Sequence, residues 1–380
     1  MRICLRNLIG SVLLFVITVA VAAPNGKLQI HFMDVGQGDG AVLISPQGQI
    51  VMFDDGNSKA CDKPLAYLES LGVDSIDYHV ASHYHSDHIG CASQIFPQVQ
   101  LKVAAYDRGH SYTTNEYQKY VAAVKGKRAT AQIGQSIVLD SGSASPVKIT
   151  FVAANGSIGV STISTTNEND LSLVALIEFG SFRAEIGGDL SGEQTGSYKD
   201  IETSVSTKVG RLDVYKVHHH CSAYSTNAAW LTTTKPTIGI ISVGVANNDY
   251  GHPAESCLER LHQAGVKLYL TEIGKGATPD PHLDTVAGTV LVEVAAGDTK
   301  YTVSYGGNRT DEYAIAGSTT GPTNTGTPSS ATTHKFAWSK NSNIYHNGSC
   351  PVVKNIKSEN LVFGETAPSG KKKHGCPDDH

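Results

Sequence analysis

The stretch SHYHSDHIG, residues 82–90, places three imidazoles and one carboxylate within six positions. It follows the apolar run SIDYHVAS, so the first histidine begins a loop at the carboxyl end of a predicted strand, where α/β proteins usually carry their chemistry. His83 and His85 can face one metal ion, while Asp87 and His88 follow a turn and can reach a second. We therefore expect a dinuclear site, most suited to zinc, although manganese and iron accept similar ligands.

Two metal ions need more ligands than these four residues supply. Asp189, in FRAEIGGDLSG, follows an apolar strand and two glycines that let the backbone approach, so its carboxylate is expected to bridge both ions. The sequence LDVYKVHHHCS again puts histidines directly after a strand. We favour His219 as a metal ligand, and His220 as a residue that supports a ligand or contacts substrate, with the register open by one residue.

The rest of the chain between residues 28 and 305 alternates β-rich runs with helical patterns, which predicts an α/β domain over 24–306. The β-rich runs are 28–33, 40–45, 49–54, 76–82, 147–153, 172–188 and 238–244, and the helical patterns lie near 63–71, 113–125, 194–208 and 254–265. Residues 307–333 are rich in Gly, Ser, Thr and Pro and predict a linker. A small module is expected over 334–380.

The amino-terminal residues have the pattern of a signal peptide. Arg2 and Arg6 precede an apolar run that ends in Ala-Val-Ala at 20–22, and the run is short for a membrane span. We expect cleavage after Ala22 and a secreted or periplasmic protein with no stable membrane span. The formal net charge of −5 predicts no surface-wide basic belt for nucleic acid.

The cysteines outside this segment form an even set, so disulfides are the default expectation in an exported protein. In the predicted module, His346 and Cys350 are four residues apart, and His374 and Cys376 lie near the end. This count fits a small zinc site. A Cys350–Cys376 disulfide is the alternative, and we favour it slightly.

Seven motifs occur in the order found in the ComEC-like branch of the metallo-β-lactamase superfamily, which this chain resembles from residue 28 to about 306. HYHSDHIG resembles the HxHxDH signature of the superfamily. The others are MDVGQGDGAVL at 33–43, VMFDDGN with Asp54, NDLSLVALIEFG, IGGDLS, KVHHHCS, and YGHP with His252. The resemblance implies an αββα sandwich with the metals at one edge, the small terminal module being additional.

The chain departs from the family pattern at one ligand. Many relatives carry an isolated third histidine for the first metal between the HxHxDH motif and the residue matching Asp189. Here that segment offers only His110, outside any matched motif. Relatives in this branch present Asn or Asp near the positions of Asn169 and Asp170, so the third ligand stays open.

The expected reaction is hydrolysis. Two zinc ions about 4 Å apart hold a bridging hydroxide that is nucleophilic at neutral pH, and they neutralise the developing oxyanion. Asp87 or Asp189 would orient the hydroxide and carry its proton. The resemblance implies that His252 or His220 stabilises the leaving or non-bridging oxygen.

The fold hosts many substrates, so the branch guides the choice of substrate. ComEC-like domains resemble nucleases, and related exported members resemble phosphorylcholine esterases. Both predict a phosphodiesterase acting on nucleic acid or an envelope polymer. The alternatives are an amide, lactone or β-lactam hydrolase, or a catalytically degenerate metal-binding protein.

The resemblance also predicts which cysteines pair. Cys91 follows the metal loop, and Cys221 and Cys257 follow the HHH and GHP motifs, which must converge on one site. We expect Cys61–Cys91 and Cys221–Cys257, with Cys350–Cys376 as the third pair.

Overall fold

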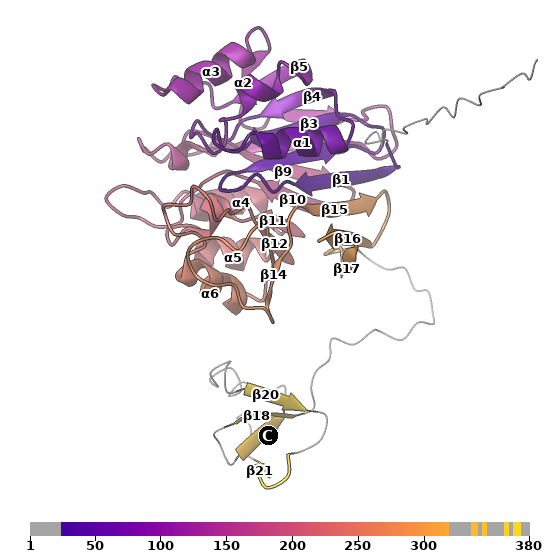
Figure 1. Ribbon diagram of the computed structural model, residues 1–380, viewed down its shortest axis with the longest axis vertical. Helices are drawn as coiled ribbons and strands as arrows, with labels where there is room; N and C mark the ends of the chain where they lie inside the picture. Colours follow the sequence, from indigo (N-terminus) through magenta and orange to yellow (C-terminus); the bar gives the residue numbers. More distant parts are fainter. Residues whose placement is uncertain (1–23, 319–335, 341–343, 348–360, 365–367, 374–380) are drawn as a thin grey trace, which may run out of the picture. The chain divides into compact units, whose positions relative to one another are not determined.

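The computed structural model describes residues 24–318, 336–340, 344–347, 361–364 and 368–373. The chain divides into two compact units, Met1–Thr319 and Thr320–His380. The first unit contains two large sheets (Figure 1). Within the described residues, no helix combines the length and the hydropathy needed to cross a bilayer. The predicted signal peptide lies outside the described residues.

The first sheet has nine strands in the order β17-β16-β15-β1-β2-β3-β4-β5-β6. Neighbours are antiparallel from β17 to β3 and parallel from β3 to β6. The strands are β1 (Lys27–Phe32), β2 (Gly40–Ile44), β3 (Ile50–Asp55), β4 (Ser75–Val80), β5 (Gln100–Asp107), β6 (Arg128–Thr130), β15 (Val290–Ala295), β16 (Lys300–Tyr305) and β17 (Arg309–Ala314).

The second sheet has eight strands in the order β14-β13-β12-β11-β10-β9-β8-β7. Neighbours are antiparallel from β7 to β10 and parallel from β10 to β14. The strands are β7 (Ser136–Leu139), β8 (Val147–Ala153), β9 (Val174–Phe179), β10 (Phe182–Ile186), β11 (Val214–Lys216), β12 (Ile238–Ile241), β13 (Lys267–Leu270) and β14 (Asp284–Val286).

The main core lies between the two sheets and follows from strand alternation. Leu28, Ile30 and Phe32 of β1 alternate toward the core and join buried residues of the second sheet. His31, between them, faces the other way and makes a 2.8 Å hydrogen-bonding contact from Nδ1 to the hydroxyl of Tyr67 in α1. The same sheet therefore packs a second sheet on one face and a helix on the other.

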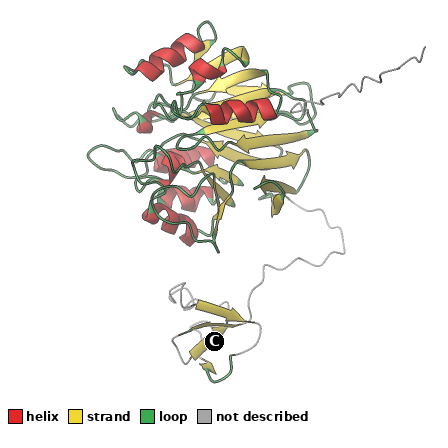
Figure 2. Cartoon of the chain, in the orientation of Figure 1, coloured by secondary structure: helices red, strands yellow, loops and turns green. Residues whose placement is uncertain are grey.

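The helices form two groups (Figures 1 and 2). Side chains of α1 and α2 join a buried cluster with the outer side chains of β2 and β3, and those of α4, α5 and α6 join another with β11, β12 and β13. The described part of the first unit is therefore the expected αββα sandwich. The helices are α1 (Asp62–Ser70), α2 (Ala92–Ile95), α3 (Asn115–Ala123), α4 (Glu202–Val209), α5 (Ala228–Thr234) and α6 (Glu255–Gln263), with short 3₁₀ turns η1 (Asn169–Leu171) and η2 (His218–Cys221).

Two predicted elements differ from the observed ones. The β-rich run 172–188 is not one strand, because the chain reverses at Gly180, whose φ of +58° glycine adopts readily, and β9 and β10 pair antiparallel. The helical pattern over 194–208 forms helix only from Glu202. The preceding backbone bonds to other segments, as in the 2.9 Å bond from Lys199 N to Asp170 Oδ2.

Two disulfides confirm the pairing expected in the first unit, Cys61–Cys91 and Cys221–Cys257. They close loops with sequence separations of 30 and 36 residues, and such a bond typically stabilises a fold by about 2–4 kcal/mol. Cys350, His374 and Cys376 lie outside the described residues, so the third pair stays a prediction.

The second unit contains a four-stranded sheet in the order β20-β18-β19-β21. Its strands are β18 (Phe336–Ser339), β19 (Ile344–Asn347), which includes His346, β20 (Leu361–Gly364) and β21 (Lys372–Lys373). The boundaries 307–333 and 334–380, and the Cys/His character of the module, stay predictions.

Candidate metal centre

The candidate site is built from loops that leave the carboxyl ends of parallel strands in both sheets. The 82–90 loop follows β4, the loop with Asp189 follows β10, and η2 follows β11. Because such strand ends meet at one edge of a sandwich, side chains more than a hundred positions apart come together. At Gly188 the chain passes so close to Ser82 that an added Cβ would lie 2.7 Å from the serine Cβ.

Four of these side chains form what we call the deep group: Asp87, His88, Asp189 and His220. The His88 Nε2 atom lies 3.3 Å from Asp189 Oδ2, and the His220 Nε2 atom lies 3.5 Å from the same oxygen and 3.4 Å from Asp87 Oδ2. His88, Asp189 and His220 are buried. Among the described residues, one side-chain group that could hold a metal ion, Asp87 with His88 and His220, falls within this set, and another joins His88 and Asp189 to His83.

The partners of the other ring nitrogens decide which atom of each deep-group histidine faces the cluster. His88 Nδ1 lies 2.8 Å from Asp54 Oδ2, and His220 Nδ1 lies 2.8 Å from the carbonyl oxygen of Ser242. Both partners accept hydrogen bonds, so each Nδ1 donates to its partner and each Nε2 is the nitrogen left to face the cluster. The protein thus fixes which nitrogen of each ring a metal ion would meet.

A second set, the outer group, consists of His83, His85, Asn169 and His219. His83 Nε2 lies 3.9 Å from Asp189 Oδ2 but only 3.0 Å from His85 Nδ1. His219 Nε2 lies 3.8 Å from Asp189 Oδ2 and 3.2 Å from Asn169 Nδ2. In the outer group, side-chain nitrogens that could bind a metal therefore lie within hydrogen-bond distance of each other.

The backbone of η2 explains how neighbouring histidines point in different directions. His219, His220 and Cys221 have φ values of 50°, 52° and 62°, in the left-handed region that residues other than glycine seldom adopt in succession. His218 is held from both sides, with Nδ1 2.8 Å from Glu202 Oε1 and Nε2 3.2 Å from Glu185 Oε1. The strained turn thus has a buried anchor at its first residue.

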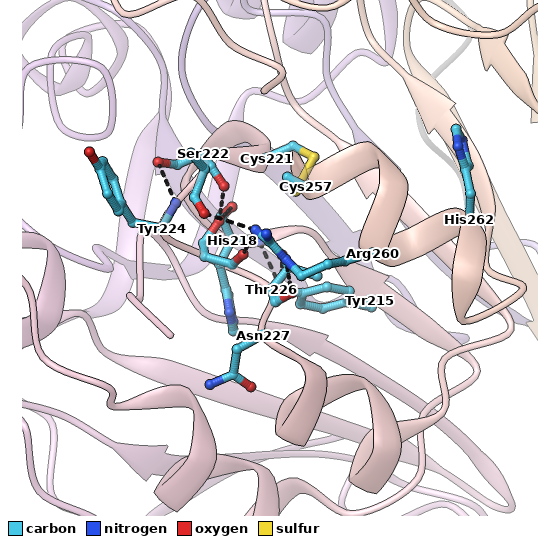
Figure 3. The surroundings of a disulfide bond; sticks show 12 residues. Tyr215, His218, Cys221, Ser222, Tyr224, Thr226, Asn227, Cys257, Arg260 and His262 are labelled. Atoms are coloured by element: carbon cyan, nitrogen blue, oxygen red, sulfur yellow. Dashed lines mark hydrogen bonds between the residues drawn. A yellow bond between two sulfur atoms is a disulfide. The ribbon is translucent and has the colours of Figure 1, made fainter. Parts of the chain in front are cut away.

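The segment after η2 is held by α6. The Cys221–Cys257 disulfide joins them, and Arg260 donates to the carbonyl oxygens of Ala223, Ser225 and Thr226 at 2.7–2.9 Å (Figure 3). Each of these bonds satisfies a carbonyl of an irregular turn. The position of His220 therefore depends on α6 as well as on its own strand.

The electrostatics of the cluster favour a cation at Asp189. Burial opposes ionisation of this carboxyl, but the imidazoles of His88, His220 and His219 outweigh burial and hold its pKa well below the ordinary range. Burial lowers the pKa of His83 well below its usual value, and that of His219 to about 4. His83 and His219 are thus neutral, whereas burial of His88 and His220 is outweighed by Asp189 and the neighbouring carboxylates, which raise the pKa of both imidazoles well above the usual value. A metal ion bound here would replace the protons that these two rings hold against the carboxylates.

Two buried residues that the sequence interpretation missed lie behind the deep group. Asp39 forms an ion pair with Lys216, and its oxygens lie 3.5 Å from His88 Nδ1 and 3.4 Å from His220 Nδ1. Lys216 also donates to the carbonyl oxygen of Gly188 at 3.1 Å. Asp39 falls inside the quoted 33–43 motif, which was the available signal for it, whereas Lys216 looks like an ordinary strand residue.

The remaining expected residues divide into those near the cluster and those away from it. His252 lines the same cavity, with its ring centroid 5.4 Å from that of His219 and 6.0 Å from that of His220. Burial, with His220 and His219, lowers the pKa of His252 to about 3. His110 is exposed and is not among the residues that line this cavity. Asn169 lines it, whereas Asp170 instead accepts from Thr165 Oγ1 at 2.8 Å.

The residues fit a metal centre by an independent criterion. Among the described residues, several buried polar atoms without a hydrogen-bond partner belong to the two groups: Asn169 Oδ1, Asp189 Oδ1, His88 Nε2, His219 Nδ1 and His220 Nε2. Buried polar atoms normally have partners. Imidazole nitrogens and carboxylate oxygens that converge without partners are what a zinc ion or a similar divalent metal would satisfy.

Comparisons with known proteins agree with the fold. A sequence model of the metallo-beta-lactamase superfamily matches residues 41–245. The chain is 22% identical over 262 residues to ComE operon protein 3 of Bacillus subtilis, covering 64% of this chain and 32% of that protein. It is 28% identical over 268 residues to recombination protein 2 of Haemophilus influenzae, covering 68% of this chain and 30% of that protein. The chain thus spans about a third of these curated relatives.

Among solved structures, the metallo-beta-lactamase fold protein YhfI of Bacillus subtilis is similar, with 14% identity and a TM-score of 0.40, covering 66% of this chain and 98% of that chain. The superfamily match spans more than half of this sequence and includes the 82–90 loop, Asp189 and η2. The chain therefore belongs to the metallo-beta-lactamase superfamily, and within it the curated relatives place it with the ComEC-like proteins.

Proposed function

We propose that this protein is an exported hydrolase that uses two divalent metal ions, preferably zinc, to cleave phosphodiesters. The observation that carries the proposal is the convergence of the unpartnered Nε2 atoms of His88 and His220 on Asp189 Oδ2, at 3.3 and 3.5 Å. A structural role would have paired these buried atoms with hydrogen-bond partners. Their lack of partners supports a site prepared for ions.

The proposed ligands follow the two groups. Asp87, His88 and His220 would hold one ion, His83 and His85 would hold the other with Asn169, and Asp189 would contact both. This assignment replaces His219 by His220 as the ligand from the triple-histidine stretch. It rests on the free Nε2 of His220, whereas the Nε2 of His219 is 3.2 Å from an amide nitrogen.

When bound, the ions would supply a hydroxide nucleophile at neutral pH and neutralise negative charge on the reacting phosphoryl group. Asp87 is half-buried and lines the cavity, so its carboxylate is placed to orient the nucleophile and accept its proton. His252 is neutral because burial depresses its pKa, and a neutral imidazole can donate one hydrogen bond to a leaving oxygen. His219 also lines the cavity, with its ring centroid 5.4 Å from that of His252, and would contact substrate.

Phosphodiesters are preferred over other substrates because of the ComEC-like relatives. One relative is named recombination protein 2, and another competence protein ComA of Neisseria gonorrhoeae. Nucleic acid is therefore our first choice among phosphodiesters, with an envelope polymer second. The two disulfides and the amino-terminal signal pattern support export.

The test compares His252→Ala with the wild-type protein on bis-p-nitrophenyl phosphate, after metal content has been measured. The variant should keep its metal and its fold but lose roughly 100-fold or more in kcat, because it lacks a group that stabilises the transition state. His282→Ala, which removes an exposed histidine, is the matched control and should behave as wild type.

Two outcomes would contradict the proposal. A change confined to KM would make His252 a substrate contact only. Wild-type protein that holds both metals and cleaves a chromogenic β-lactam or a lactone, but no phosphodiester, would replace phosphodiesterase by the alternative hydrolase.

A further inference from the structure

Three tyrosines from separate loops line the cavity on the side of His219 and His252. Tyr198 precedes α4, Tyr224 lies between η2 and α5, and Tyr250 lies between β12 and α6. The rings of Tyr198 and Tyr224 stack, with centroids 4.9 Å apart and an interplanar angle of 26°. Tyr250 is 82% exposed and lies nearly parallel to the His252 ring, at 22° and 6.1 Å. We call these three side chains the tyrosine wall.

The tyrosine wall reaches from solvent to the candidate metal centre. The ring centroid of Tyr198 is 6.1 Å from that of His219, which is in turn 5.4 Å from that of His252. The cavity measures about 580 Å³, enough for a nucleotide-sized ligand. A group bound against the wall would therefore lie near enough for a phosphate attached to it to reach the metal-ligand cluster.

The other side chains in the lining limit how such a group can be recognised. The acidic and imidazole side chains of the described lining are Asp87, Glu116, Glu168, Asp189, His85, His219, His220 and His252. Glu168 is already paired with Arg108 at 2.6 Å. The remaining lining consists of serines, threonines, amides and tyrosines. Beyond the phosphate, the aromatic ring faces are thus the apolar surface in this lining that a planar group can pack against.

We propose that the tyrosine wall binds an unpaired nucleobase of the phosphodiester substrate by stacking. This inference rests on the proposed function and adds its substrate class: single-stranded ends and short oligonucleotides. A planar base can continue the nearly parallel Tyr198–Tyr224 stack, and every base has a π face, so recognition tolerates any sequence. In a duplex, both faces of an internal base are already stacked, so the wall selects for single strands.

The experiment compares two esters with the same leaving group, thymidine 5′-(p-nitrophenyl phosphate) and methyl p-nitrophenyl phosphate. For the wild-type protein, kcat/KM should favour the thymidine ester by roughly 10- to 100-fold, the range expected for one base on an aromatic platform. Tyr250→Ala should lower this ratio at least 5-fold, and Tyr250→Phe should preserve it because the ring is kept. Val160→Ala is the control, since that side chain is 80% exposed and lies outside the described lining.

A second measurement separates binding from turnover. Calorimetric titration should show tighter binding of thymidine 5′-monophosphate than of methyl phosphate to wild-type protein, and Tyr224→Ala should reduce the difference. Equal kcat/KM for the two esters would overturn the inference and leave the proposed function intact. Cleavage of neither ester would instead contradict the proposed function. A stronger preference for a p-nitrophenyl phosphodiester of N-acetylglucosamine would assign the wall to a sugar and also overturn the inference.

Discussion

The deep group and the outer group of the candidate centre contain similar side chains but differ in how the protein holds them. In the deep group, Asp54 and the carbonyl of Ser242 orient the rings of His88 and His220, and both free nitrogens face Asp189. In the outer group, His83 Nε2 lies closest to His85, which is only half-buried. We infer that the deep group is prepared for an ion by its surroundings, whereas the outer group rearranges to bind one.

This difference shows that a signature motif supplies metal-ligand side chains but does not by itself fix where their ligand atoms point. The HxHxDH stretch contributes to both groups. In the deep group, Asp54 of β3 and the carbonyl after β12 hold the histidine rings directly, whereas His83 Nδ1 of the outer group lies 3.1 Å from the hydroxyl of the adjacent Ser82. Orientation of this kind typically changes metal affinity by 10–100-fold. The two ions should therefore bind stepwise, the deep one more tightly.

The largest loss of metal and activity is expected from a change at Asp189, because its carboxylate lies near histidines of both groups. Asp189→Ala removes the oxygen that faces His88, His220 and His83. We expect it to retain less than one equivalent of metal after dialysis, against about two for wild type, and to lose essentially all hydrolysis. Elemental analysis by mass spectrometry measures the metal.

The matched control for that variant is Asp249→Ala, since the Asp249 side chain is 80% exposed. It should keep both equivalents. Retention of two equivalents by Asp189→Ala would show that the two groups bind metal independently of this carboxylate.

The second prediction compares metal loss in variants of two neighbouring histidines, one from each group. His220→Ala should lose the deep ion, because it removes a free Nε2 located 3.4 Å from Asp87. His219→Ala should keep both ions and bind substrate less tightly. Metal stoichiometry of the two variants, measured side by side, decides between them, and the reverse result would restore His219 as the ligand.

The smallest effect is expected where only the orientation of a ligand ring is changed, without removal of the ligand. Asp54→Asn keeps the size of the side chain but can place an amide donor opposite His88 Nδ1, which shifts the imidazole proton to Nε2. We expect the deep ion to bind about 10–100-fold more weakly while the outer ion is little changed. Competition with a chromogenic chelator measures both affinities. Asp74→Asn, at an exposed aspartate, should change neither, and unaltered binding in Asp54→Asn would remove the argument for orientation.

Much of the fold was predictable because its signals are local or ordered along the chain. Alternating apolar residues marked β1, short apolar runs marked β2 and β3, and the motif order implied the sandwich. The strand before the triple histidine was also expected and is β11. The hairpin at Gly180 was missed, since a continuous apolar run hides a turn.

The sequence alone determined the chemistry of the site: His83, His85, Asp87 and His88 are close in any fold, and Asp189 and the triple histidine follow strands that a sandwich brings to one edge. Only the tertiary structure decided where the side chains of the site point and which residues hold them in place. Three left-handed residues turn His220 inward, Lys216 pairs with an aspartate from the other sheet, and tyrosines from three loops share one cavity. The physical reason is that spacing fixes which residues can approach, whereas the orientation of a side chain depends on backbone angles and partners that only the packed chain supplies.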